Sequence, residues 1–212
     1  MDTLTQQKKP AESAARAPKR IAVVTMGVKL GDETRGYTRF RFLSELLARE
    51  GAIITPILSG SVNTMDTRFF TADEVKRRIS EITQEPILTT IQQVEPIGPR
   101  AMTDLMIVAP CTGNTLGKLA CGIVDTAVTM AVKSHLRRMK PVLIAVSTND
   151  ALGAAARNIG ALMNYKHMYF LPMAQDDPVK KPNSLVARFE LMRAGAREAL
   201  NGRNLQPVML EK

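Results

Sequence analysis

Several polar stretches in this sequence directly follow apolar runs and carry residue types that bind small ligands. One of them, PCTGNT, occupies residues 110–115. Gly113 permits a tight turn and a close approach of a ligand, and Asn114 offers both a hydrogen-bond donor and an acceptor. We expect Asn114 or Thr115 to cap the following helix, but a cap explains only one residue. The other small polar residues beside Pro110 favour a ligand-binding loop, because function concentrates on such loops.

Three further stretches have the same character. They are TMGVKLGD at residues 25–32, SGSVNT at residues 59–64 and STND at residues 147–150. The first lacks the GxGxxG spacing of a dinucleotide site, so an NAD site in this chain is weakly supported, but its backbone N–H groups could hold a phosphate. The second offers hydroxyls for an anion, with Arg68 just beyond, and is equally consistent with an ordinary solvated turn. The third repeats the small polar composition of residues 110–115.

The elements around these stretches predict an α/β fold. Short apolar runs alternate with helical patterns, and continuous apolar runs are typical of buried parallel strands. We expect strands at residues 21–26, 52–58, 86–91, 105–109, 142–146 and 168–171. Doubly wound sheets bind ligands at the carboxyl ends of their strands, so the polar stretches are expected to converge on one edge.

The ends and apolar faces of three helices can be predicted. Thr71 and Glu74 have the spacing of a capping box, which starts a helix over residues 71–83. Asn183 is expected to cap the last helix, and Asn201 with Gly202 to end it. The core face of that last helix is expected to hold Leu185, Phe189, Met192 and Ala196. The core face of the helix after residue 115 is expected to hold Leu116, Leu119, Ile123 and Ala127.

The chain of 212 residues carries a formal net charge of +9, but the distribution of charge gives little support to nucleic-acid binding. Residues 1–19 are expected to form a disordered basic arm before a single domain over residues 20–212. Lys133, Arg137, Arg138 and Lys140 lie at the end of a predicted helix, where cations complement the helix dipole. Anionic small molecules and an acidic protein surface remain open as partners.

Composition excludes other classes of protein. Because aromatic residues make up 4% of the chain and no base-stacking motif is present, we expect no nucleic-acid partner. No apolar run approaches the roughly 18 residues of a membrane span. The N-terminal stretch lacks the apolar segment of a secretory signal, so we expect a cytoplasmic protein.

The cysteines and histidines give no sign of a metal site. Cys111 and Cys121 lack a second Cys or His pair at metal-ligand spacing, so free thiols are the favoured interpretation. His135 lies within a predicted helix, and His167 precedes a predicted strand. Each is expected to be a surface or structural histidine rather than a catalytic one.

Residues 109–126, APCTGNTLGKLACGIVDT, resemble the proline-containing loop and following helix of the homo-oligomeric flavin-containing decarboxylase superfamily. The segments SVNTMDTRF, VEPIGP, STNDALG, QDDPVKKPNSLVAR and LQPVMLEK are similar to the family of dipicolinate synthase B subunits, and the similarity extends over residues 19–212. The resemblance implies a three-layer α/β/α flavoprotein-like fold with a mostly parallel sheet. It also implies that the chain acts with a dehydrogenase-like A subunit, which would carry NAD(P), to oxidise a tetrahydrodipicolinate-type dicarboxylate to dipicolinate during sporulation.

The same resemblance assigns residues to ligands. Around an FMN ring or a bound carboxylate it places Pro110, Thr112, Gly113, Asn114 and Thr115. It assigns Thr25 and Gly27 to one phosphate-holding turn, and Ser59 and Ser61 to a second. It assigns Thr148, Asn149 and Asp150 to the loop that faces the substrate, and Asn114 is also expected to bind the substrate. Lys180 and Lys181 are expected to bind the dianionic substrate or the partner chain, or to be a solvated pair. The resemblance further implies a homo-oligomer.

The sequence departs from the superfamily pattern in two places. A longer segment with Lys29, residues 26–36, replaces the compact glycine-serine turn, which leaves the flavin phosphate site open. The histidine that the decarboxylases carry after a middle strand is missing from residues 86–100. Catalytic residues therefore stay unassigned. The alternative to a B subunit that takes part in catalysis is a non-catalytic scaffold with an empty flavin pocket. A weaker alternative is an independent flavin-dependent decarboxylase.

Overall fold

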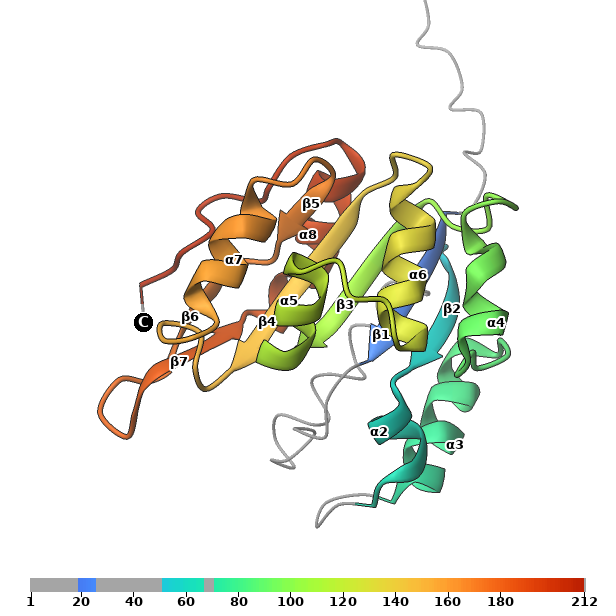
Figure 1. Cartoon of the computed structure of the whole chain (residues 1–212), viewed down its shortest axis with the longest axis horizontal. Helices are drawn as coiled ribbons and strands as arrows, with labels where there is room; N and C mark the ends of the chain where they lie inside the picture. Colours follow the sequence, from blue (N-terminus) through green and yellow to red (C-terminus); the bar gives the residue numbers. More distant parts are fainter. Residues whose placement is uncertain (1–18, 26–50, 67–70, 212) are drawn as a thin grey trace, which may run out of the picture.

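The computed structural model describes residues 19–25, 51–66 and 71–211, shown in colour in Figure 1. Gly27, Lys29 and Arg68 lie outside the described residues. So do residues 1–18, which make up nearly all of the expected arm. The predictions for these positions therefore stay predictions.

A seven-stranded sheet forms the centre of the described structure (Figure 1). Its parallel strands have the order β2-β1-β3-β4, and β5 pairs with the first half of β4. They are β1 (Arg20–Thr25), β2 (Ile53–Leu58), β3 (Leu105–Cys111), β4 (Val142–Thr148) and β5 (Met168–Phe170). An antiparallel hairpin of β6 (Met173–Asp177) and β7 (Lys181–Ala187) continues the sheet from the second half of β4.

Helices cover both faces of this sheet, so the predicted three-layer α/β/α fold is confirmed. One face packs against α4 (Ile91–Val94), α5 (Gly113–Ala120), α6 (Ala127–Leu136) and α7 (Ala156–Met163). The other packs against α2 (Gly60–Thr64), α3 (Ala72–Thr83) and α8 (Met192–Leu200). Side chains of β3 alternate between the two cores, with Met106 in the first and Ile107 in the second. Within the described ranges, no helix has the length and hydropathy of a membrane-spanning segment.

Five of the six predicted strands are confirmed, and one is wrong. Residues 86–91 contribute only an isolated bridge between Leu88 and Ile57. Ile91 instead begins α4, because Thr90 caps that helix. The hydroxyl of Thr90 accepts a hydrogen bond from the backbone N–H of Gln93 (3.3 Å), and the Gln93 side chain accepts one from the N–H of Thr90 (3.1 Å). This reciprocal cap ends the extended run.

The predicted start of the last helix is also wrong. Asn183 lies inside strand β7 rather than at a helix cap, and its carbonyl accepts a hydrogen bond from the N–H of Leu152 (3.0 Å). Leu185 is buried by pairing of β7 with β4 and β6, while α8 begins only at Met192. Pairing with two other strands thus overrides the helical spacing of the apolar residues. The predicted end is confirmed, because Gly202 follows α8 with a φ of +77°.

Two other helix predictions need correction. The hydroxyl of Thr71 caps α3 as expected, but the carboxylate of Glu74 bonds to arginines of its own helix and does not close a capping box. The residue that caps α5 is Thr112, not Asn114 or Thr115, and its side chain makes no capping bond. The apolar face predicted for α5 stops early, since Gly122 has a φ of +69°, Ile123 is 47% exposed and Ala127 belongs to α6. Leu116 and Leu119 are buried as predicted.

Candidate functional site

The polar stretches after β2, β3 and β4 lie at one edge of the described sheet, as predicted. Strands β1, β2, β3 and β4 are parallel, so their carboxyl ends meet there. From β1 the chain passes to β2 on one side and then to β3 on the other side. Doubly wound sheets bind their ligands at this reversal of strand order. The loop that follows β3 therefore occupies the position where a ligand is expected.

The loop between β3 and α5 follows a fully buried strand and leads to unpaired backbone N–H groups among the described residues. Strand β3 runs through Pro110, which follows a cis peptide bond, to Cys111, and every residue of the strand is buried. The backbone N–H groups of Gly113 and Asn114, at the start of α5, make no hydrogen bond to the described residues. The first turn of a helix leaves such donors for a ligand, where they favour negative charge.

Gly113 brings this loop against the end of β4. A Cβ atom placed on Gly113 would lie 2.8 Å from Oδ1 of Asp150 and 3.1 Å from Oγ1 of Thr148. The Thr148 hydroxyl in turn donates a hydrogen bond to Oδ1 of Asp150 (2.5 Å). Residues 113, 148 and 150, predicted from separate stretches, thus form one cluster. A glycine is required at this point because any side chain would displace the carboxylate.

Exposed amides flank the cluster. The side chain of Asn114 is exposed at the start of α5, and Asn149 is exposed between Thr148 and Asp150. Thr115 is fully buried and Thr112 half-buried, so their side chains line the base of the loop rather than its surface. The cluster therefore holds amides, a carboxylate and backbone N–H groups that bond to no described residue, which suit the polar edge of a planar ring or a carboxylate ligand.

The predicted phosphate-holding turns are described in part. Thr25 ends β1 opposite Leu58, the last residue of β2. Ser59 follows and caps α2, since its Oγ accepts a hydrogen bond from the N–H of Val62 (3.3 Å). Ser61 is exposed in the first turn of α2. Thr25 and Ser59 thus lie at the predicted edge, and the Ser59 hydroxyl keeps its proton available as a donor.

Lys180 and Lys181 do not join the cluster. They lie at the turn of the β6–β7 hairpin, where Val179 is 89% exposed. Thr148 of β4 pairs with Leu185, and Lys181 lies four residues before Leu185 in β7, about 13 Å away at the usual rise of a strand. The Lys181 ammonium pairs with Oδ2 of Asp176 (2.8 Å). In Figure 1 the hairpin extends beyond the sheet, away from α5.

His135 is a structural residue, as expected. Its Nδ1 lies 2.8 Å from Oγ1 of Thr103, and its Nε2 lies 2.9 Å from the carbonyl of Pro141. A carbonyl only accepts, so the proton is on Nε2 and the Thr103 hydroxyl donates to Nδ1. Burial lowers the pKa of His135 to about 4, despite the opposing effect of the hydrogen bond to Pro141. The ring is neutral at pH 7 and far from the loop cluster in the fold, at the other end of α6.

The cysteines differ in accessibility. Burial raises the pKa of the Cys111 thiol well above its ordinary value, so this thiol is unreactive at pH 7. Cys121 is a free, exposed thiol after α5. In the described ranges no group of three or more metal-ligating side chains comes together.

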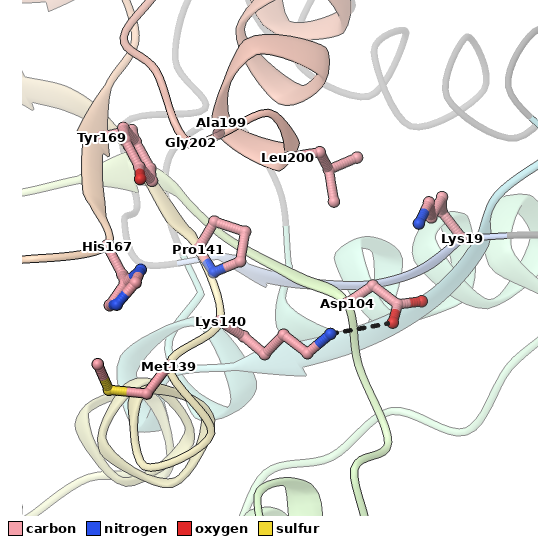
Figure 2. A pocket seen from close by; sticks show the side chains of 10 residues that line it. All are labelled: Lys19, Asp104, Met139, Lys140, Pro141, His167, Tyr169, Ala199, Leu200 and Gly202. Carbon is pink, nitrogen blue, oxygen red and sulfur yellow. Dashed lines mark ion pairs between the residues drawn. The ribbon is translucent and has the colours of Figure 1, made fainter.

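Sequence reasoning missed a pocket of about 280 Å³ at the opposite edge of the sheet (Figure 2). It lies where β1, β3, β4 and β5 begin, and its wall includes Lys19, Asp104, Lys140 and His167. These residues are far apart in the sequence. The only local signal is the repeated placement of ionisable residues directly before strands.

Comparisons with known proteins agree with this architecture. The profile of the flavoprotein family matches residues 37–184. The dipicolinate synthase B chain of Bacillus subtilis (strain 168) is 40% identical over 167 residues, which span 79% of this chain and 84% of the relative. The crystal structure of the corresponding B chain of dipicolinate synthase from Bacillus halodurans has a TM-score of 0.81 at 39% identity, covering 92% of this chain and 97% of that chain. The resemblance found in the sequence is thus confirmed.

A more distant structure shares the fold alone. Burkholderia xenovorans DmrB in complex with FMN, a cubic protein cage for redox transfer, has a TM-score of 0.60 at 17% identity. The match covers 88% of this chain and 97% of that chain.

Proposed function

The chain belongs to the flavoprotein family, and we propose that it works as the B subunit of a dipicolinate synthase, together with a dehydrogenase-like A subunit. The observation that carries the proposal is the cluster of Gly113, Thr148 and Asp150 at the carboxyl ends of β3 and β4, next to the switch point of the sheet. It is supported by the similarity to B subunits over most of the chain.

FMN fits the start of α5. The backbone N–H groups of Gly113 and Asn114 and the exposed Asn114 amide match the donors and acceptors on the polar edge of a flavin ring. Ser59 would contribute a hydroxyl toward the phosphate, with Thr25 beside it. When bound, the flavin would supply a centre that exchanges electrons with a substrate. The residues of this chain would hold and orient it.

The substrate of the proposed reaction is a cyclic dicarboxylate. Asn114 and Asn149 would donate hydrogen bonds to its carboxylates, and Asp150 would accept one from a ring N–H or hydroxyl group. The Thr148 hydroxyl holds Asp150 in place for that contact. Aromatisation of a tetrahydro ring removes two hydride equivalents and two protons, and the hydride acceptor, NAD(P), would belong to the A subunit. This chain would orient the ring and exclude water.

The proposal includes the setting of the protein. Lys180 and Lys181, on a hairpin that extends beyond the sheet, are suited to contact a partner chain rather than a ligand in the loop cluster. We place the protein in the cytoplasm of a spore-forming cell, as a homo-oligomer that binds the A subunit.

Reconstitution from purified chains tests the proposal. Dipicolinate formation from the tetrahydrodipicolinate-type precursor with nicotinamide cofactor is followed for the A subunit alone, for this chain alone and for both together. Activity only in the mixture supports a shared reaction. Full activity of the A subunit alone would contradict it. The visible absorption spectrum of this chain after incubation with FMN separates a flavin-binding protein from a scaffold, because only the former retains the bound chromophore.

A further inference from the structure

The pocket at the edge of the sheet where β1, β3, β4 and β5 begin has about the size of a site for a small molecule. Its volume is about 280 Å³, just below the roughly 300–1,000 Å³ typical of ligand pockets. Figure 2 shows Lys19, Lys140 and Asp104 on one side of the opening and Tyr169 with His167 on the other. It lies opposite the loop cluster, since the strands begin here and end there. It is therefore separate from the proposed FMN and substrate site.

The charge of the wall favours an anion. Oδ2 of Asp104 accepts a hydrogen bond from the backbone N–H of Arg20 (3.0 Å), and the Nε of Arg20 lies 3.8 Å from the same oxygen, close to the outer limit of an ion pair. The Lys140 ammonium is 3.9 Å from Oδ1 of Asp104, which is the outer limit of an ion pair, and Lys19 has no ionic partner among the described residues. Both ammonium groups keep hydrogen-bond donors for a ligand. The pocket thus has two cations on its wall and one carboxylate that already accepts a hydrogen bond.

The rest of the wall is apolar and favours a ring. Pro141, Tyr169 and Leu200 face the cavity together with Met139 (Figure 2). A tyrosine ring beside aliphatic side chains offers apolar contact area to a flat ring. His167 also lines the pocket, and its Nε2 is buried without a hydrogen-bond partner in the described part of the chain.

Exposed cations lie at the same edge of the sheet as the pocket. Arg137 and Arg138 directly follow α6, and Lys166 directly precedes His167. All three are exposed and form no ion pair with another described residue. Because α6 and α7 both lead into strands that begin at this edge, the charges gather on the same side as the pocket. A surface of one sign raises the local concentration of anions and speeds their entry.

We propose that this pocket binds a small aromatic carboxylate at a distance from the loop cluster. The identity of the ligand rests on the proposed function: dipicolinate, a single aromatic ring with two carboxylates, has the size, the flat shape and the charge that the wall selects. The site would let the product of the reaction bind to this chain without entering the site where it is formed.

Isothermal titration calorimetry with dipicolinate tests the site directly on the full chain. The wild-type protein is compared with Lys140→Met, which removes a cation, and Leu200→Trp, which fills the cavity. Lys133→Met removes an exposed lysine of α6 that does not line the pocket and serves as the matched control. We expect dipicolinate to bind the wild type, the affinity to fall at least tenfold in both pocket variants, and the control to be unchanged.

Binding at the loop cluster is distinguished by the variant Asn114→Ala. If the pocket is a site of its own, Asn114→Ala still shows a dipicolinate-binding event, and adding Lys140→Met to that variant weakens this event at least tenfold. The proposal is overturned if the wild type does not bind, if Lys140→Met binds normally, or if Asn114→Ala abolishes binding. Leu200→Trp is interpreted only if its thermal unfolding matches that of the wild type. If it does not, binding to Lys140→Met decides the test. If dipicolinate does not bind in the pocket, the two chains together can still form dipicolinate. If the two chains together do not form dipicolinate, calorimetry can still detect its binding in the pocket.

Discussion

Gly113 and Asp150 lie so close that the first could not carry a side chain without moving the second. A Cβ atom on Gly113 would be 2.8 Å from Oδ1 of Asp150. The two residues come from different strand ends, so their contact joins the loop after β3 to the loop after β4. This contact is the structural basis of the proposed site.

Replacement of Gly113 by alanine is expected to damage activity more than stability. The added methyl group meets the end of an exposed carboxylate, which can move aside, so the free energy of unfolding should change by less than about 1 kcal/mol. The displaced Asp150 should lower kcat/KM of the two-chain reaction about tenfold or more. Gly117→Ala in the same helix is the control, since its nearest neighbour would be 3.6 Å away. Equal activity of the two variants would contradict the assignment.

The hydroxyl of Thr148 is expected to act by positioning Asp150. Thr148→Val removes the hydrogen bond to Oδ1 and preserves the shape of the side chain, whereas Thr148→Ser keeps the hydroxyl. We expect kcat/KM to fall roughly 5- to 30-fold in the valine variant, corresponding to about 1–2 kcal/mol, with substantial recovery in the serine variant. Steady-state kinetics with both chains measures this. If serine and valine are equally impaired, the hydroxyl has no such role.

Gly98 is expected to be essential for stability rather than function. Its added methyl group would overlap the backbone carbonyl of Ser134, in the adjacent helix α6, and backbone cannot move aside as a side chain can. Gly98→Ala should lower the free energy of unfolding by about 2–4 kcal/mol in urea titrations. Gly160→Ala, in helix α7 with nothing within 4 Å, should be neutral or stabilising. A fully stable Gly98→Ala protein would contradict the close contact between α6 and the turn after η1 (Glu95–Ile97).

His135 is expected to make stability depend on acid pH. Burial lowers its pKa to about 4 in the folded chain, below the ordinary 6.5 of the unfolded chain. Between these values the unfolded state binds more protons, so this contribution to stability is complete above pH 6.5 and is lost as pH falls toward 4. The loss is about 3 kcal/mol at most. His135→Phe should remove this pH dependence while lowering stability overall. Urea titrations at several pH values between 4 and 7 measure the free energy of unfolding. The assignment is contradicted if this free energy depends on pH in the variant as it does in the wild type.

Much of the fold could be predicted because its signals are local. The buried runs that became β1, β3 and β4 are continuous and apolar, and parallel strands with helices between them set where their polar ends must meet. Gly113, Thr148 and Asp150 were therefore predicted to lie at one edge, although their direct contact was not. The contact depends on how two loops pack, which residue types alone do not determine.

The wrong start of the last helix and the missed pocket both depend on pairing between distant residues. Leu185, Phe189 and Met192 have helical spacing, but Leu185 lies opposite Thr148 in a sheet that is formed by residues nearly forty positions away. Likewise, Lys19, Asp104 and Lys140 each precede a different strand, and only the parallel order of these strands brings them around one pocket. No local pattern of the sequence contains either relationship.

The most direct test of the shared site is the rate of dipicolinate formation by the A subunit with Asn114→Ala in place of the wild-type chain. Asn164→Ala, which removes an exposed amide at the other edge of the sheet, is the matched control. The proposed site predicts that the rate collapses with Asn114→Ala and is unchanged with Asn164→Ala, while both variants still bind the A subunit. An undiminished rate with Asn114→Ala would show that the loop at residues 110–115 does not take part in the reaction.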